Sequence, residues 1–169
     1  MTIPYFIRVA IQTAIVALAS YLCGFHFSSL FHPESGAIGG LWSAISGIVV
    51  LQTTQRETWS SASLRVLGTL IGAICSAVYL SLLSFSPIGI AVCIFVTVLI
   101  CHAVRVPSHA RLGAITVVVI MVVASLDTVP NPILSATLRF TESFIGTTIA
   151  ILIAIIWPDS KVDTKPRDV

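Results

Sequence analysis

The stretch SASLRVLGTLIG (residues 61–72) has a partner later in the chain, and the two together decide the fold that the sequence predicts. Its first five residues nearly recur as SATLR (135–139), at an offset of 74 positions. An Ile-Gly pair follows each arginine at the same distance, at 71–72 and 145–146. A shift by the same 74 positions also overlays the short apolar segment at 37–51 on the short one at 112–126. This pattern predicts two related halves.

The composition puts these halves in a membrane. Hydrophobic residues make up 56% of the 169 residues and charged residues only 9%, whereas a soluble domain carries about 25% charged residues. So few charges cannot cover the surface of a soluble domain, and the high hydrophobicity excludes disorder. Long apolar runs such as 115–123 also lack the alternating pattern of a membrane β-barrel. The sequence therefore predicts an all-α polytopic membrane protein.

Six apolar segments are expected to form the transmembrane helices. A spanning helix takes roughly 20 residues, within a range of about 17–25. The second and fifth segments are short, with 15 residues each, though neighbouring uncharged residues can extend them; the other four are long enough. We expect one transmembrane domain over residues 1–158, followed by a charged cytoplasmic tail at 159–169. The segments are 5–27, 37–51, 64–83, 88–104, 112–126 and 133–157, with breaks at 32–36, 55–57, 84–87, 105–109 and 127–132.

The basic residues predict the orientation of the chain in the membrane. Cytoplasmic loops carry an excess of Lys and Arg. If the N-terminus is cytoplasmic, eight of the nine Lys and Arg residues lie on the cytoplasmic side and only Arg139 lies outside. We therefore expect both termini in the cytoplasm, and a multi-pass protein of a bacterial inner membrane. The eight are Arg8, Arg56, Arg65, Arg105, Arg111, Lys161, Lys165 and Arg167.

Three helices in each half predict an inverted repeat. The first copy covers about 5–83 and the second about 88–157. Because three is odd, the second copy enters the membrane from the opposite side, which gives a 3+3 repeat about an axis in the membrane plane. Such repeats are typical of secondary transporters, which hold their substrate near the midplane. The chain has no GxSxG, HExxH or P-loop motif, so we expect a transporter and not an enzyme.

Two arginines at matching positions of the repeat, Arg65 and Arg139, are the main candidates for substrate binding. A guanidinium group holds a carboxylate through two hydrogen bonds, and we expect the pair at opposite sides of the membrane. For Arg65 the alternative is an interfacial anchor that reaches the headgroups. For Arg139 it is a salt bridge with Glu142, three residues further on the same helix face. Trp42, by stacking on an aromatic substrate or by packing alone, and Gln52 complete the candidate set.

Two titratable residues are candidates for proton coupling. Glu142 is one, because an ionisable residue inside a membrane is usually functional; its alternative role is to neutralise Arg139. His102 is the other, because histidine titrates near neutral pH; its alternative is hydrogen bonding at the membrane interface. The four cysteines have no CxxC or Cys/His spacing, so we expect no metal site and no cofactor.

Small residues at helical spacing are expected where helices pack closely. Two GxxxG patterns, at 36–40 and 68–72, let membrane helices approach one another. The contacts lie within the bundle or at the interface of a dimer. The expected packing residues are Gly36, Gly40, Gly68, Gly72 and Gly146.

The segments 42–52, 57–59 and 65–73 resemble the membrane domain of the fusaric acid resistance and aromatic acid exporter superfamily. They are also similar to the membrane region of plant aluminium-activated malate transporters. The most specific element is Arg-x-x-Gly-Thr-x-x-Gly, carried by Arg65, Gly68, Thr69 and Gly72. The resemblance implies a six-helix exporter or channel for organic anions, often aromatic carboxylates, with two such domains around a central path.

The expected partners are therefore membrane lipid, an organic anion and a second copy of the chain. A net charge of +2 is too small to indicate nucleic acid. The alternative function is that of a membrane scaffold, or a subunit of a larger complex, that transports nothing itself.

Overall fold

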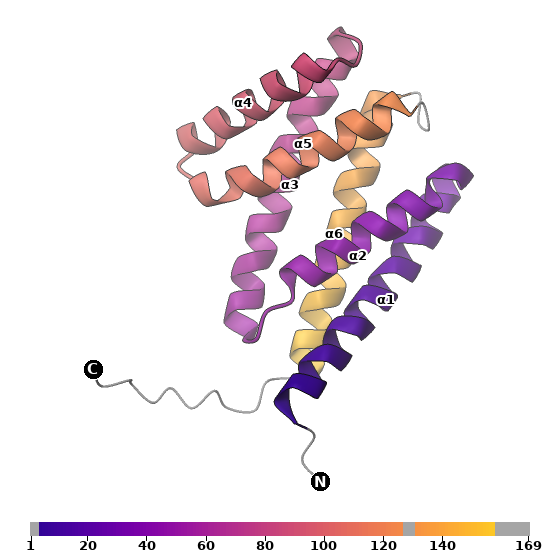
Figure 1. Ribbon diagram of the computed structural model, residues 1–169, viewed down its shortest axis with the longest axis vertical. Coiled ribbons are helices and arrows are strands. Elements are labelled where there is room, and N and C mark those ends of the chain that lie inside the picture. Colours follow the sequence, from indigo (N-terminus) through magenta and orange to yellow (C-terminus); the bar gives the residue numbers. More distant parts are fainter. Residues whose placement is uncertain (1–3, 127–130, 158–169) are drawn as a thin grey trace.

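The computed structural model describes residues 4–126 and 131–157, which form six α-helices and two short 3₁₀ helices (Figure 1). The 3₁₀ helices, η1 (Pro33–Ser35) and η2 (Pro107–His109), lead into α2 and α5. No strand occurs within the described ranges, so the prediction of an all-α fold is confirmed. The α-helices are α1 (Tyr5–Phe31), α2 (Gly36–Val50), α3 (Gln55–Leu82), α4 (Pro87–Ala103), α5 (Ala110–Ser125) and α6 (Pro132–Ile156).

Four helical segments are long and apolar enough to cross a membrane. They are Phe6–Phe31, Gln55–Leu82, Pro107–Ser125 and Pro132–Ile156. The fifth segment is extended at its start, because η2 runs directly into α5 and the two together span 19 residues. The fourth helix, α4, is apolar but has 17 residues, and α2 has 15. The chain is a multi-pass membrane protein.

Helix α3 begins earlier than the apolar pattern predicts. It starts at Gln55, so the break expected at 55–57 is instead its first turn. The side chain of Thr54 accepts a hydrogen bond from the backbone N–H of Glu57 at 3.2 Å, which satisfies a donor that the first turn leaves free. Glu57 also places a negative charge at the positive end of the helix dipole. A polar cap therefore extends the helix beyond its apolar core.

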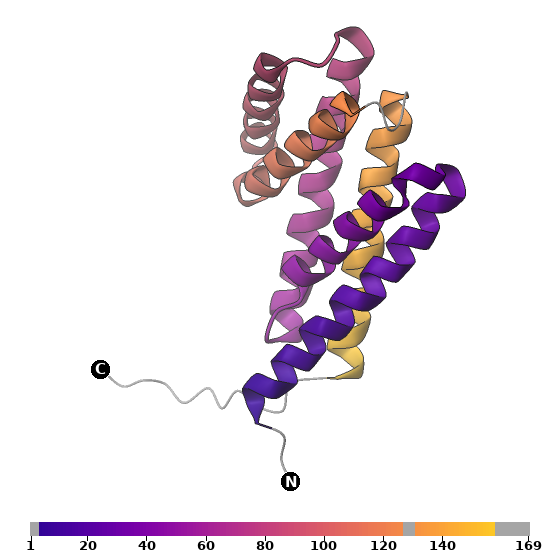
Figure 2. The same ribbon diagram turned by 45° about the vertical axis from the view of Figure 1, so that its right-hand side comes forward.

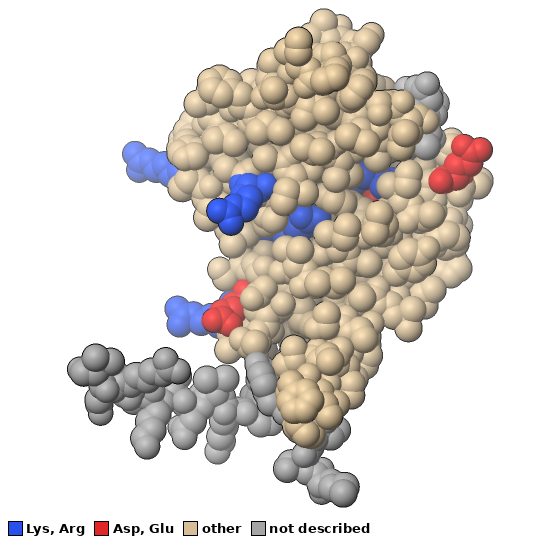
Figure 3. All heavy atoms as spheres, viewed as in Figure 1, with Lys and Arg blue, Asp and Glu red and all other residues tan. Residues whose placement is uncertain are grey.

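Helices α3 and α6 form the centre of the bundle, and a hairpin of two helices lies against each (Figures 1 and 2). The α1–α2 hairpin packs mainly on α6, and the α4–α5 hairpin packs mainly on α3. Among the described residues, no Cα atom of α2 lies within 8 Å of one in α5. A furrow separates the two hairpins, with a few charged atoms recessed in it, while most of the face shown is uncharged (Figure 3).

Contacts along the α3–α6 seam follow the offset of 74 residues. Thr69 and Ser143, which are 74 positions apart, meet with their hydroxyl oxygens 3.3 Å from each other. Two apolar grooves of about 510 and 220 Å³ lie on the seam, and every residue lining the smaller one stands 74 positions from a residue lining the larger. Residues meet their own counterparts only near an axis that relates two copies. These contacts support the inverted repeat, which stays a prediction.

The five glycines expected at helix contacts lie at such contacts. Added Cβ atoms would meet α1 at Gly36 and Gly40 and the C-terminal end of η2 at Gly68. At Gly72 and Gly146 they would meet the backbone of α5 and of α2. Small residues let membrane helices approach this closely. The central helices α3 and α6 can therefore pack directly against the backbones of both hairpins.

Replacing Gly146 with alanine should destabilise the bundle. Its Cβ would press against the carbonyl of Ser43 on α2, and a backbone group cannot rotate away. We expect a loss of about 1–3 kcal/mol in the free energy of unfolding, measured by thermal unfolding in detergent. Gly36→Ala is the matched control, because its nearest neighbours are the side chains of Ser29 and Phe25. A loss no larger than that of the control would contradict the prediction.

Candidate functional site

A cluster of charged and hydroxyl side chains lies inside the bundle, where α2 meets α3 and α6. Arg65 is 1% exposed, and Arg139 and Glu142 are 0% exposed. The alternative of an interfacial anchor is wrong for Arg65, because its enclosed side chain does not reach the surface. The two arginines were expected at opposite sides of the membrane, but both lie against the same residue, Trp42.

Arg65 is held by Ser46 and Trp42, both of α2. Its Nε and Nη2 atoms donate hydrogen bonds to the Ser46 hydroxyl at 3.2 and 2.9 Å. Its guanidinium carbon lies 4.6 Å from the centre of the Trp42 ring, which places the cation over the negative face of the indole. No carboxylate in the described part of the chain forms an ion pair with Arg65. An uncompensated buried cation is costly, and an anion would relieve that cost.

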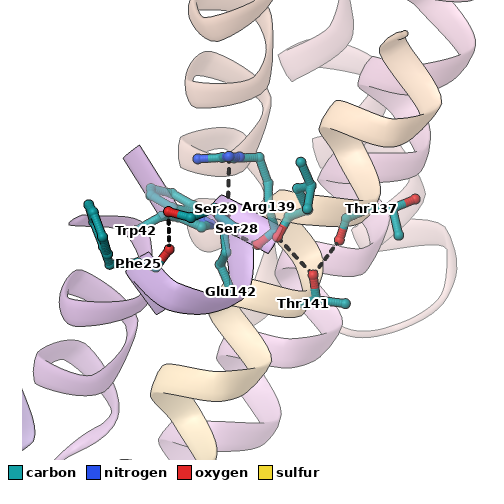
Figure 4. A network of polar contacts seen from close by, with 9 residues as sticks. Phe25, Ser28, Ser29, Trp42, Thr137, Arg139, Thr141 and Glu142 are labelled. Carbon is teal, nitrogen blue, oxygen red and sulfur yellow. Dashed lines mark hydrogen bonds and ion pairs between the residues drawn. The ribbon is translucent and has the colours of Figure 1, made fainter. Parts of the chain in front are cut away.

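Arg139 and Glu142 form the ion pair that was one of the sequence-based alternatives. The Arg139 Nη2 atom lies 2.8 Å from Glu142 Oε1, and the Ser28 hydroxyl of α1 donates to the same oxygen at 2.5 Å. The indole N–H of Trp42 donates to the backbone carbonyl of Arg139 at 3.0 Å. Figure 4 shows these side chains gathered where α1, α2 and α6 come together. The pair therefore ties three helices to one another.

Two serines that sequence reasoning missed, Ser46 and Ser143, extend the hydrogen bonds of Arg65 to α6 and back to α3. The Ser46 hydroxyl lies 3.2 Å from that of Ser143 on α6, and Ser143 in turn lies 3.3 Å from Thr69 on α3. The available signal was spacing: Ser46 is four residues after Trp42, and Ser143 is four residues after Arg139. Residues four apart share a helix face, so these hydroxyls belong on the faces that carry the larger candidates.

Trp42 also reaches the furrow between the hairpins. A groove of about 320 Å³ between α2 and α5 is lined by apolar side chains and by Trp42. One side of the indole therefore belongs to an apolar opening, and its ring contacts the cation of Arg65. The apolar side chains that line the groove include Ile38, Leu41, Ile45, Val118 and Val122.

Two candidates lie away from the cluster. Gln52 is exposed beyond the end of α2, where its side-chain amide donates to the carbonyl of Val49 at 3.1 Å. His102 is exposed at the end of α4, with Nδ1 2.9 Å from the carbonyl of Val98. Both side chains are exposed and bond to the backbone of their own helix, and the structure gives neither a contact with Arg65 or Arg139.

The family model described as fusaric acid resistance protein-like matches residues 15–153. The chain belongs to the fusaric acid resistance protein-like family. The match covers the whole cluster, from Ser28 to Ser143, and confirms the resemblance drawn from the Arg-x-x-Gly-Thr-x-x-Gly element. No curated protein and no solved structure matches the chain. Similarity to the plant malate transporters stays a prediction.

Membership of the fusaric acid resistance protein-like family gives the fold a general role. It indicates a membrane transporter-type protein for the efflux of organic compounds. The apolar helices agree with that role, since four of them are long enough to cross a membrane. Three charged side chains, Arg65, Arg139 and Glu142, are buried inside the bundle of this member of the family.

Replacing Trp42 with phenylalanine should lower the stability of the protein while keeping an aromatic ring beside Arg65. The ring remains, but the indole N–H that donates to Arg139 is lost. We expect a loss of about 1 kcal/mol in the free energy of unfolding, measured by thermal unfolding in detergent. Trp59→Phe is the matched control, because Trp59 is 56% exposed and should change stability by less than about 0.5 kcal/mol. Equal melting temperatures for the two variants would contradict this role for Trp42.

Proposed function

We propose that this protein exports organic anions across the membrane, as a transporter or channel for carboxylates that carry an aromatic body. The observation that carries this proposal is the guanidinium of Arg65, which is 1% exposed and has no ion-pair partner among the described residues. A carboxylate supplies both the missing negative charge and two hydrogen-bond acceptors. Membership of an efflux family supports the same conclusion.

The surroundings of Arg65 favour an aromatic or other apolar body on the anion. The groove between α2 and α5 is lined by apolar side chains, and one of its lining residues, Trp42, also contacts the cation. An anion whose carboxylate approaches Arg65 would leave its apolar part beside the indole. A small, strongly hydrated inorganic anion would gain nothing from this lining.

The proposed architecture is that of two inverted halves with both termini in the cytoplasm. The contacts between residues 74 positions apart support the repeat. The side chain of Gln12 donates to the carbonyl of Trp157 at 2.9 Å. This contact supports placing the N-terminal part of α1 and the C-terminal end of α6 on the same side of the membrane. The cations at 161, 165 and 167, the break at 127–130 and the tail from 159 lie outside the described residues.

The proposed setting is a bacterial inner membrane, where two copies of the chain act as a homodimer and surrounding lipid covers the remaining apolar surface. Many large apolar side chains are exposed, among them Leu18, Ile74, Phe95 and Phe144. Lipid or a second chain must cover them, because such a surface is unstable in water. The proposal includes transport alone, with no chemical reaction.

Neutralising Arg65 should reduce anion flux. In proteoliposomes loaded with radiolabelled benzoate, we expect Arg65→Gln to lower efflux at least about tenfold, because a charge-assisted hydrogen bond contributes about 1.5–3 kcal/mol. Arg65→Lys should retain part of the flux, since it keeps the charge but loses the planar fork. Arg111→Gln is the control, because Arg111 is an exposed cation. Unchanged flux in Arg65→Gln would refute the arginine mechanism.

The same reconstitution separates transport from a scaffold role. Purified wild-type protein should release benzoate faster than empty liposomes. If it moves none of a panel of aromatic and aliphatic carboxylates, the proposal fails and the non-transporting membrane subunit is favoured.

Single cysteines should report the orientation. In a background with the four native cysteines replaced, we expect Glu34→Cys to react with a membrane-impermeant maleimide in intact spheroplasts. Arg105→Cys should react only after permeabilisation, because it lies on the predicted cytoplasmic side; both positions are exposed. The reverse labelling pattern would place the termini outside.

A further inference from the structure

We propose that, of the two arginines at matching positions, Arg65 alone receives the anion, while Arg139 and Glu142 form a charge-neutral pair that closes the second position to anions. This inference rests on the proposed anion transport and deepens it. It follows from two differences between the halves of the chain. Each difference is a pair of residues 74 positions apart, one in each half.

The first difference stands three residues after each arginine. It is Gly68 in the first half and Glu142 in the second. A Cβ added to Gly113 would stand 3.0 Å from the carbonyl oxygen of Gly68. Gly39 of α2 stands 74 positions before Gly113 of α5, so the contact of α2 with α6 corresponds to that of α5 with α3. A Cβ added to Gly39 would stand 2.7 Å from Glu142 Oε1. The crossing in the first half therefore holds the backbone of Gly68 and the methyl group of Thr97, which carry no charge, whereas the crossing in the second half holds a carboxylate.

The second difference is the acceptor offered by the neighbouring helix. Ser46 accepts hydrogen bonds from two nitrogens of Arg65. Its counterpart, 74 positions later, is Ile120, which is fully buried in an apolar cluster with Ala73 and Ala136. Isoleucine offers no acceptor. Arg65 is thus held by a neutral hydroxyl and keeps its charge, whereas Arg139 has a carboxylate in place of the hydroxyl.

The charges decide which guanidinium binds an anion. A carboxylate approaching Arg65 meets a cation, two α2 side chains and no negative charge among the described residues. One approaching Arg139 meets Glu142, whose Oε1 atom already lies 2.8 Å from the guanidinium, and two like charges in a poorly solvated interior repel strongly. The Nε and Nη1 atoms of Arg139 lack hydrogen-bond partners in the described part of the chain. Neutral acceptors can satisfy them, but an anion there would stand beside Glu142.

The test compares neutral variants of similar size by calorimetric titration of the purified protein with benzoate. We expect Arg65→Gln to weaken binding at least about tenfold. The double variant Arg139→Gln/Glu142→Gln removes one charge of each sign and should bind within about threefold of wild type. Its glutamine at 142 keeps an acceptor for the Ser28 hydroxyl, and the Trp42 hydrogen bond goes to a backbone carbonyl. If the double variant weakens binding as much as Arg65→Gln while melting at the wild-type temperature, the inference is overturned.

The single variant Glu142→Gln gives a second, opposite readout. It leaves Arg139 as an uncompensated cation, so we expect tighter benzoate binding or a second equivalent of bound anion. Unchanged or weaker binding overturns the inference, and this variant decides the matter if the double variant fails to fold. Absence of benzoate binding by the wild-type protein would instead count against the proposed transport, so the two failures are distinguishable.

Discussion

Burying the positive charge of Arg65 inside an apolar bundle is the constraint on which the rest of the site depends. Removing a guanidinium from water costs several kcal/mol unless polar groups replace its hydration. Here the replacement comes from one helix, since Ser46 and Trp42 both belong to α2. Helix α2 must therefore lie close to α3, although it packs far more extensively on α1 and α6. The hydrogen bond from Trp42 to Arg139 on α6 holds it there.

The close approach of α2 to the central helices depends in turn on small residues. A larger side chain at position 146 would push α2 away by its backbone, and the hydroxyl of Ser46 would no longer reach both Arg65 and Ser143. Polar side chains at such crossings form interhelical hydrogen bonds of modest strength. The hydrogen bonds of the cluster therefore depend on close helix packing, because they form only where the helix backbones nearly touch.

The sequence predicts the six helices well because a bilayer imposes a length and a composition on each. It predicts their ends less well, as α3 and α5 show, because a threonine cap or a 3₁₀ turn adds polar residues that an apolar pattern does not detect. The ion pair of Arg139 follows from spacing along one helix. The partners of Arg65 do not, because they come from a different helix. Which residues of two helices meet is set by packing that one sequence does not reveal.

A repeated arginine motif does not by itself give two equivalent charges. Both halves carry the same Ser-Ala-x-Leu-Arg sequence, and both arginines are buried to nearly the same extent. Their electrostatic states differ because of single neighbours: Gly68 leaves one cation uncompensated, and Glu142 neutralises the other. Gly113 faces uncharged groups of Gly68 and Thr97, whereas Gly39, which stands 74 positions earlier, faces the carboxylate of Glu142. In the inverted repeat that we propose, the two copies would therefore keep one fold while only one of them offers charge to an anion.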